Sequence, residues 1–151
     1  EKMESSPVYG RVELVNIDSE LAEPSSVDAV ITFRNLHNWL GPQMDSIFSN
    51  SYKALKSGGV FGIVEHRAEP GTTMEVMKKS GYVTEELAIE MAEKHGFKFV
   101  AKSEINANPK DTKDHPRGVW TLPPSYRLKE QDKEKYQNIG ESDRMTLLFK
   151  K

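Results

Sequence analysis

The sequence predicts an α/β domain whose mainly parallel sheet carries an antiparallel strand at its C-terminal end. Two short apolar runs, at residues 27–33 and 60–64, have the length and composition of strands buried on both faces. Between them, residues 42–56 carry apolar side chains every three or four positions, which is typical of a helix packed on a sheet. Strands that alternate with helices in this way indicate a parallel sheet.

A further strand is predicted near the N-terminus. Residues 8–17 are rich in β-branched side chains and end at Asp18. Residues 19–26 hold turn-forming residues and a proline, so they predict a loop into the strand at 27–33. Pro42 then suits the first turn of a helix, where a missing N–H needs no partner.

The middle of the chain continues the alternation of helices and strands. Gly58 is placed to form a left-handed cap on the helix at 42–56, before the strand at 60–64. Residues 69–81 are rich in glycine, threonine and lysine and predict a loop with at most a short helix at 74–79.

The last strands are predicted to pair with each other. Thr84 is a suitable N-cap for a helix at 85–95. Residues 97–105 alternate in polarity as a strand does, and residues 145–149 form a short apolar run. We expect these two strands to be antiparallel neighbours.

Residues 106–144 form a long insert between these last two strands. The segment contains four prolines and many charges, and so long a connection favours a functional flap. A short solvated helix is expected at 128–139. Trp120 and Tyr126 could close over a substrate or pack on the sheet or another subunit, and packing is favoured because large aromatic side chains usually bury area. Residues 1–151 are predicted to be a single domain.

Composition excludes several classes of partner. The 21 basic and 23 acidic residues give a net charge of -2, so binding to nucleic acid is not indicated. No segment is long and apolar enough to span a membrane, and the N-terminus lacks the pattern of a signal peptide. The absence of cysteine fits a reducing compartment. The default expectation is a cytoplasmic protein, unless a segment preceding Glu1 has been removed.

Polar side chains follow both buried strands, at the sheet edge where α/β proteins bind their ligands. They are Arg34, Asn35, His37 and Asn38 after the first strand, and Glu65, His66 and Arg67 after the second. His37 or His66 beside a carboxylate could act as a general base; the alternative is a polar surface at the strand ends. His37, Glu65 and His66 could also be metal ligands, but their spacing matches no known motif, so no metal site is predicted.

Three stretches carry a resemblance to a known family. They are V-E-L-V-N-I-D at 12–18, V-D-A-V-I-T-F-R-N-L-H-N-W at 27–39 and A-L-K-S-G-G-V-F-G-I-V-E-H at 54–66. With the order of elements, they resemble the C-terminal two-thirds of a class I S-adenosylmethionine-dependent methyltransferase, which has a Rossmann-like, doubly wound sheet. The resemblance implies transfer of a methyl group from S-adenosylmethionine to an unidentified small-molecule acceptor.

The resemblance also implies roles for individual residues. Asp18 matches an acidic residue that often meets the adenine amino group in this family. Arg34, Asn35 and Leu36 end the strand that lines the methionine side of the cofactor. His37 or His66 would be the catalytic residue that removes the acceptor proton.

The glycine-rich cofactor loop of that family is missing here. It should precede residue 8, but Gly10 is the only glycine before Gly41. Such a turn lets backbone N–H groups approach the cofactor closely. We therefore expect poor cofactor affinity and no methyl transfer by this chain alone. The alternatives are a non-catalytic remnant that oligomerises or binds a partner, and another nucleotide-binding domain, which would need the same loop.

A gap in the sheet follows from the same departure. The family's strand order is three, two, one, four, five, seven, six, so losing the first two strands separates residues 12–17 from residues 27–33. Both facing edges would expose unpaired backbone groups. We expect either that the first strand moves beside the strand at 27–33, or that two chains pair these edges in a homodimer.

Overall fold

A computed structural model describes residues 7–151 and contains a four-stranded mixed sheet in the order β1-β2-β4-β3. The strands are β1 (Val27–Phe33), β2 (Leu55–His66), β3 (Lys98–Ser103) and β4 (Arg144–Lys150). β1 and β2 are parallel, and β4 is antiparallel to both β2 and β3. The predicted α/β class, with an antiparallel C-terminal strand next to β3, is confirmed.

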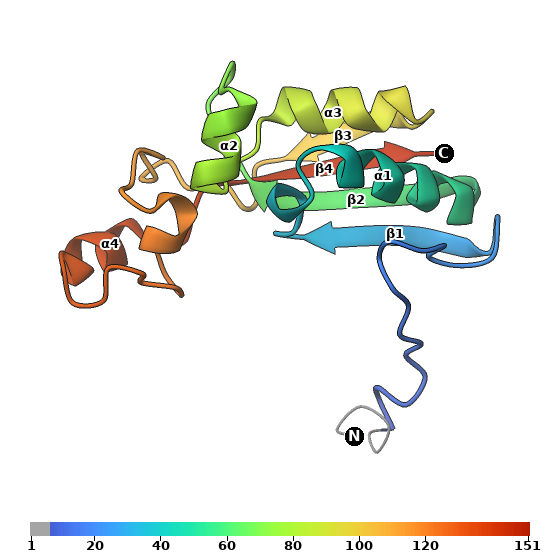
Figure 1. Cartoon of the computed structure of the whole chain (residues 1–151), viewed down its shortest axis with the longest axis horizontal. Coiled ribbons are helices and arrows are strands. Elements are labelled where there is room, and N and C mark those ends of the chain that lie inside the picture. Colours follow the sequence, from blue (N-terminus) through green and yellow to red (C-terminus); the bar gives the residue numbers. More distant parts are fainter. Residues whose placement is uncertain (1–6) are drawn as a thin grey trace.

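Two helices cover one face of this sheet (Figure 1), namely α1 (Pro42–Ala54) and α3 (Glu85–Lys94). Their apolar sides join alternate residues of β2 and β4 in one core. Aromatic rings make up much of it, with Phe48 of α1 edge-on to Phe61 of β2 at 5.2 Å between centroids. Thr84 caps α3 as predicted, since its hydroxyl accepts the Leu87 N–H at 3.2 Å.

The predicted strand at residues 8–17 is wrong. This segment consists of turns and irregular backbone and is exposed to solvent. It extends away from the sheet on the side of β1 (Figure 1). A strand needs a neighbour for its backbone groups, and local β propensity does not provide one. The expectation that this segment moves beside β1 is wrong too, because no strand within residues 7–151 pairs with the outer edge of β1.

The boundary between α1 and β2 also differs from prediction. α1 ends at Ala54, and Leu55 already belongs to β2, where it pairs with Val27. Gly58 has a positive φ of 80°, but it lies within β2 and does not cap the helix. Leu55 is completely buried, so its packing stabilises an earlier start of the strand than a helix cap at Gly58 predicted.

The opposite face of the sheet is apolar and uncovered by the described residues. Ile31 is 64% exposed and Phe33 is 58% exposed, although both lie in the middle or at the end of a strand. Together with Gly62, Val64 and Leu148 they line a shallow groove of about 410 Å³. None of the helices in residues 7–151 has the length and apolar character needed to cross a membrane.

The connection from β3 to β4 lies beyond the carboxyl ends of β1 and β2 (Figure 1). It contains a single turn of 3-10 helix, η2 (Gly118–Thr121), and the short helix α4 (Lys133–Ile139), which covers only part of the helix expected at 128–139. Buried Asp111 anchors the connection by accepting the Tyr82 hydroxyl at 2.9 Å and the Asp143 N–H at 2.8 Å. Another short helix, α2 (Met74–Ser80), packs against η2.

Candidate active site

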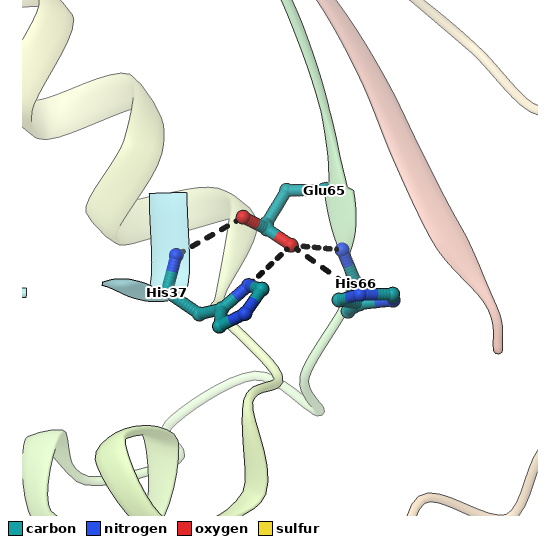
Figure 2. Close-up of side chains that lie close together, drawn as sticks. All are labelled: His37, Glu65 and His66. Carbon is teal, nitrogen blue, oxygen red and sulfur yellow. Dashed lines mark hydrogen bonds and ion pairs between the residues drawn. The ribbon is translucent and has the colours of Figure 1, made fainter. Parts of the chain in front are cut away.

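A buried glutamate holds the first of the two predicted histidines (Figure 2). Glu65 is fully buried, and its carboxylate accepts the backbone N–H of His37 at 3.0 Å and lies 3.1 Å from the Nδ1 atom of the same residue. An ionised carboxylate can only accept, so this contact favours the imidazole tautomer with its proton on Nδ1. In that neutral tautomer, Nε2 is the ring nitrogen that can accept a proton.

Local structure explains why these two residues meet. β2 continues to His66, and its alternate side chains Phe61, Ile63 and Glu65 all point toward the buried side. After β1 the chain turns into η1 (Leu36–Asn38), which brings His37 to the end of β2. The Glu65 carboxylate also accepts the His66 N–H at 2.8 Å, so it ties the ends of both strands together.

His66 lies beside the same carboxylate but has a different environment. Its ring centroid is 5.4 Å from that of His37, and its Nδ1 atom shares a hydrogen bond with the Ser142 hydroxyl. Burial of the ring lowers the pKa of His66 to about 4, despite the nearby Glu65 charge, which opposes the change. The ring is therefore neutral near pH 7.

Both histidines line a pocket of about 250 Å³ that the connection from β3 to β4 encloses. Its other polar side chains come from Arg34, Asn35, Ser125, Glu141, Ser142 and Arg144. Trp120 forms one wall and meets His37 edge-on, with 5.8 Å between ring centroids. Trp120 packs on His37 at the pocket wall, as the favoured expectation has it, whereas its closure over a substrate stays a prediction.

The other predicted site residues lie at different places. Arg34 and Asn35 line the pocket, whereas the Leu36 side chain is fully buried in the core. Asp18 is exposed and accepts a hydrogen bond from Gln43 Nε2 at 2.7 Å. It does not line the pocket that contains the histidines.

A second cavity of about 390 Å³ follows the free edge of β1 and adjoins the first. Phe33 and Asn35 line both cavities. Ile17, next to Asp18, lines the second one together with Trp39. The two cavities together offer space for a ligand with an apolar part along β1 and a polar part near the histidines.

The donor set of His37, Glu65 and His66 could also be considered for a metal ion, since one ligand atom from each lies within 4.8 Å of the others. Both oxygens of Glu65 already accept N–H groups, however. Two arginine side chains line the same pocket and would repel a cation. The geometry therefore fits a hydrogen-bonded histidine better than a metal centre.

Several pocket residues were not among those predicted. Glu65 lies behind His37 and does not line the pocket; the sequence predicts it only as a polar strand end and possible metal ligand, although the period-two burial of Phe61 and Ile63 extends to it and indicates a buried side chain. Ser142 and Arg144 reach the pocket because β4 runs antiparallel to β2, with Arg144 opposite His66. No local pattern marks them, since they follow an irregular segment.

Solved structures resemble this fold, whereas no protein-family model and no curated protein sequence matches the chain. An S-adenosylmethionine-dependent methyltransferase from Methanosarcina mazei has a TM-score of 0.58 at 11% identity, covering 99% of this chain and 74% of that one. Another from Archaeoglobus fulgidus has a TM-score of 0.56 at 17% identity, covering 94% and 69%. The cyclase SpnF has a TM-score of 0.58 at 15% identity, covering 92% and 54%.

The chain thus has the fold of class I S-adenosylmethionine-dependent methyltransferases, as its sequence resemblance predicted. It spans 54% to 74% of the lengths of these three proteins. Since a cyclase shares the fold, the fold alone does not determine the reaction.

Proposed function

We propose that this chain carries the acceptor side of an S-adenosylmethionine-dependent methyltransferase, with His37 as its general base. The observation that carries the proposal is the fully buried Glu65 carboxylate, which orients His37 at the carboxyl ends of two parallel strands. Open α/β sheets place their ligands at this edge. The methyltransferase fold of the chain suggests the reaction.

In the proposed reaction, the acceptor's nucleophilic atom forms a bond to the methyl carbon as the carbon–sulfur bond breaks. The electron pair of that bond remains on sulfur, which gives S-adenosylhomocysteine. The acceptor proton passes to Nε2 of His37, and the resulting positive charge is stabilised by the Glu65 carboxylate at Nδ1. His66, which is neutral, is the weaker candidate because burial disfavours its protonation.

The two adjoining cavities suggest how S-adenosylmethionine would lie. The second cavity, along β1, suits an adenosine group. Ile17 lines this cavity, and the adjacent Asp18 would bind the adenine amino group. Arg34, Asn35 and Leu36 would contact the methionine part through their backbone atoms. When bound, the cofactor supplies an electrophilic methyl group, and this chain's residues orient the acceptor and receive its proton.

Titration with S-adenosylhomocysteine, followed by amide NMR, tests the proposal. We expect weak binding by the 151-residue chain, in about the millimolar range, because residues 1–40 contain only one glycine, Gly10, and so supply it with no glycine-rich turn. The shifts should appear along β1, at the end of β2, at His37 and at the Trp120 indole of η2. Adenine-free homocysteine serves as the matched control ligand. A folded chain whose resonances at these sites do not move at saturating ligand would overturn the proposal.

A second candidate function is self-association without catalysis, and the uncovered sheet face favours it. Parallel sheets are normally covered on both faces, yet Ile31 is largely exposed and the outer edge of β1 has no partner within residues 7–151. Two copies could pair their β1 edges about a two-fold axis, which would extend the sheet, or stack their apolar faces, which would bury Ile31 of each copy.

Light scattering over a wide range of protein concentrations tests this second candidate. We expect a dimer, and we expect Ile31→Lys to shift it to monomer by placing a charge in the interface. Val76→Lys is the matched control, because Val76 is also about half exposed but lies on α2. A monomer at every concentration, or equal effects of both substitutions, would contradict self-association through this face.

A further inference from the structure

Two arginine side chains give the pocket beside His37 an excess of positive charge. Arg34 and Arg144 both line it, and Glu141 is the only carboxylate among its lining residues. Glu65 lies behind His37 and is already bonded to N–H groups. Arg144 is paired with His66 across β4 and β2, and the Arg34 N–H donates to the Val64 carbonyl two residues before His66, so both arginines belong to backbone next to this ring. The pocket is therefore suited to an anionic ligand.

Arg34 is held in an uncommon backbone conformation without an ionic partner. Its φ of 54° lies in the left-handed region, which residues other than glycine seldom adopt. Its backbone N–H donates to the Val64 carbonyl at 2.7 Å, which fixes this turn at the end of β1. No carboxylate in residues 7–151 forms an ion pair with its guanidinium. Strained residues of this kind concentrate at ligand sites.

Arg144 contributes a buried donor that has no acceptor. Its Nη2 atom forms an ion pair with Glu141 at 2.6 Å, but its Nε atom is buried and has no hydrogen-bond partner in the described part of the chain. An unsatisfied buried donor is unfavourable, and a ligand oxygen would relieve it. The N–H groups of a guanidinium form a fork that matches the two oxygens of a carboxylate.

We propose that Arg34 and Arg144 bind a carboxylate group of the methyl acceptor. The acceptor is then a small carboxylic acid that also carries an amine or hydroxyl nucleophile. Its carboxylate lies between the two guanidinium groups, and its nucleophile reaches Nε2 of His37. The small pocket, about 250 Å³, limits the acceptor to a few non-hydrogen atoms beyond the carboxylate. That the bound carboxylic acid is the methyl acceptor rests on the proposed function, whereas the presence of a carboxylate site does not.

Glycolate and its amide, glycolamide, form a matched pair of probes for NMR titration of the full 151-residue chain. We expect glycolate to shift the Arg144 Nε–H and Trp120 indole signals, with an affinity at least about tenfold above that of glycolamide. Arg34→Gln should weaken glycolate binding by about tenfold, while Arg34→Lys retains part of it. Arg11→Gln is the control, because it removes the same charge from an exposed residue that does not line the pocket.

S-adenosylhomocysteine, whose own carboxylate could occupy the same arginines, is the second arm of the experiment. Glycolate binding that requires Arg34 supports the inference whether or not S-adenosylhomocysteine binds, so failure of the proposed function remains distinguishable. Equal binding of glycolate and glycolamide would overturn the inference. The inference would also be overturned if S-adenosylhomocysteine bound, glycolate did not, and Arg34→Gln abolished the binding of S-adenosylhomocysteine. Arg34 would then bind the cofactor.

Discussion

Glu65→Leu is expected to lower the free energy of unfolding by about 3 kcal/mol, because three donors lose their shared acceptor. The donors are the backbone N–H groups of His37 and His66 and the Nδ1–H of His37. Leucine accepts no hydrogen bond, and water cannot replace the carboxylate at a site with no exposed surface. Urea denaturation followed by tryptophan fluorescence measures the change.

Glu90→Leu provides the control for the loss of a glutamate. Glu90 is exposed on α3, so its replacement should change stability by no more than about 0.5 kcal/mol. If Glu65→Leu also cost less than about 1 kcal/mol, the carboxylate would not be the acceptor that joins β1 and β2.

Glu65→Gln separates the orientation of His37 from stability. Glutamine keeps the shape of the side chain but replaces one accepting oxygen with an NH₂ group. We expect His37 to lose its preference for the Nδ1-protonated form, which ¹⁵N NMR of the imidazole nitrogens detects. His95 is hydrogen-bonded to Asp45 of α1 instead of to Glu65, so it should keep its spectrum and serves as an internal control. An unchanged His37 spectrum would contradict the role given to Glu65.

Elements with a periodic pattern could be predicted from the sequence. The apolar run at 27–33 became β1 with the same bounds, and the helix begun by Pro42 ends within two residues of the prediction. In both cases the pattern reflects burial against one neighbouring layer, which local sequence records. Residues 8–17 have strand propensity without such a neighbour, so they remain irregular.

The pocket could be predicted only in part, because one side is formed by the ends of predicted strands and the other by the irregular connection from β3 to β4. His37 and His66 follow predicted strands, so the parallel sheet brings them together. Trp120 and Ser142 belong to the connection from β3 to β4, whose path depends on contacts such as Asp111 with Tyr82. These contacts are distant in sequence and follow no period, so sequence alone does not place these walls.

Asp143 is expected to make the protein lose stability in acid. Burial by itself would raise the pKa of Asp143, but hydrogen bonds from Arg67, from the Asn108 backbone N–H and from Lys113 outweigh it. The resulting pKa is about 2, compared with 3.8 for an ordinary aspartate. Because the folded pKa is lower than the unfolded one, this stabilisation is complete above about pH 4 and is lost as the pH falls toward 2.

The lowered pKa corresponds to about 2 kcal/mol of stability at neutral pH. Asp143→Asn should remove at least this amount at pH 7, because Arg67 keeps only Glu85 and Glu104 as partners. Urea denaturation at pH 7, 4 and 2 should therefore show the two proteins converging in acid. Asp28→Asn is the control, since Asp28 pairs with Lys56 at an exposed site and should change stability little at any pH. Parallel stability curves for Asp143→Asn and the unaltered protein between pH 4 and 2 would contradict the assigned role, because the difference between them must shrink as Asp143 takes up its proton.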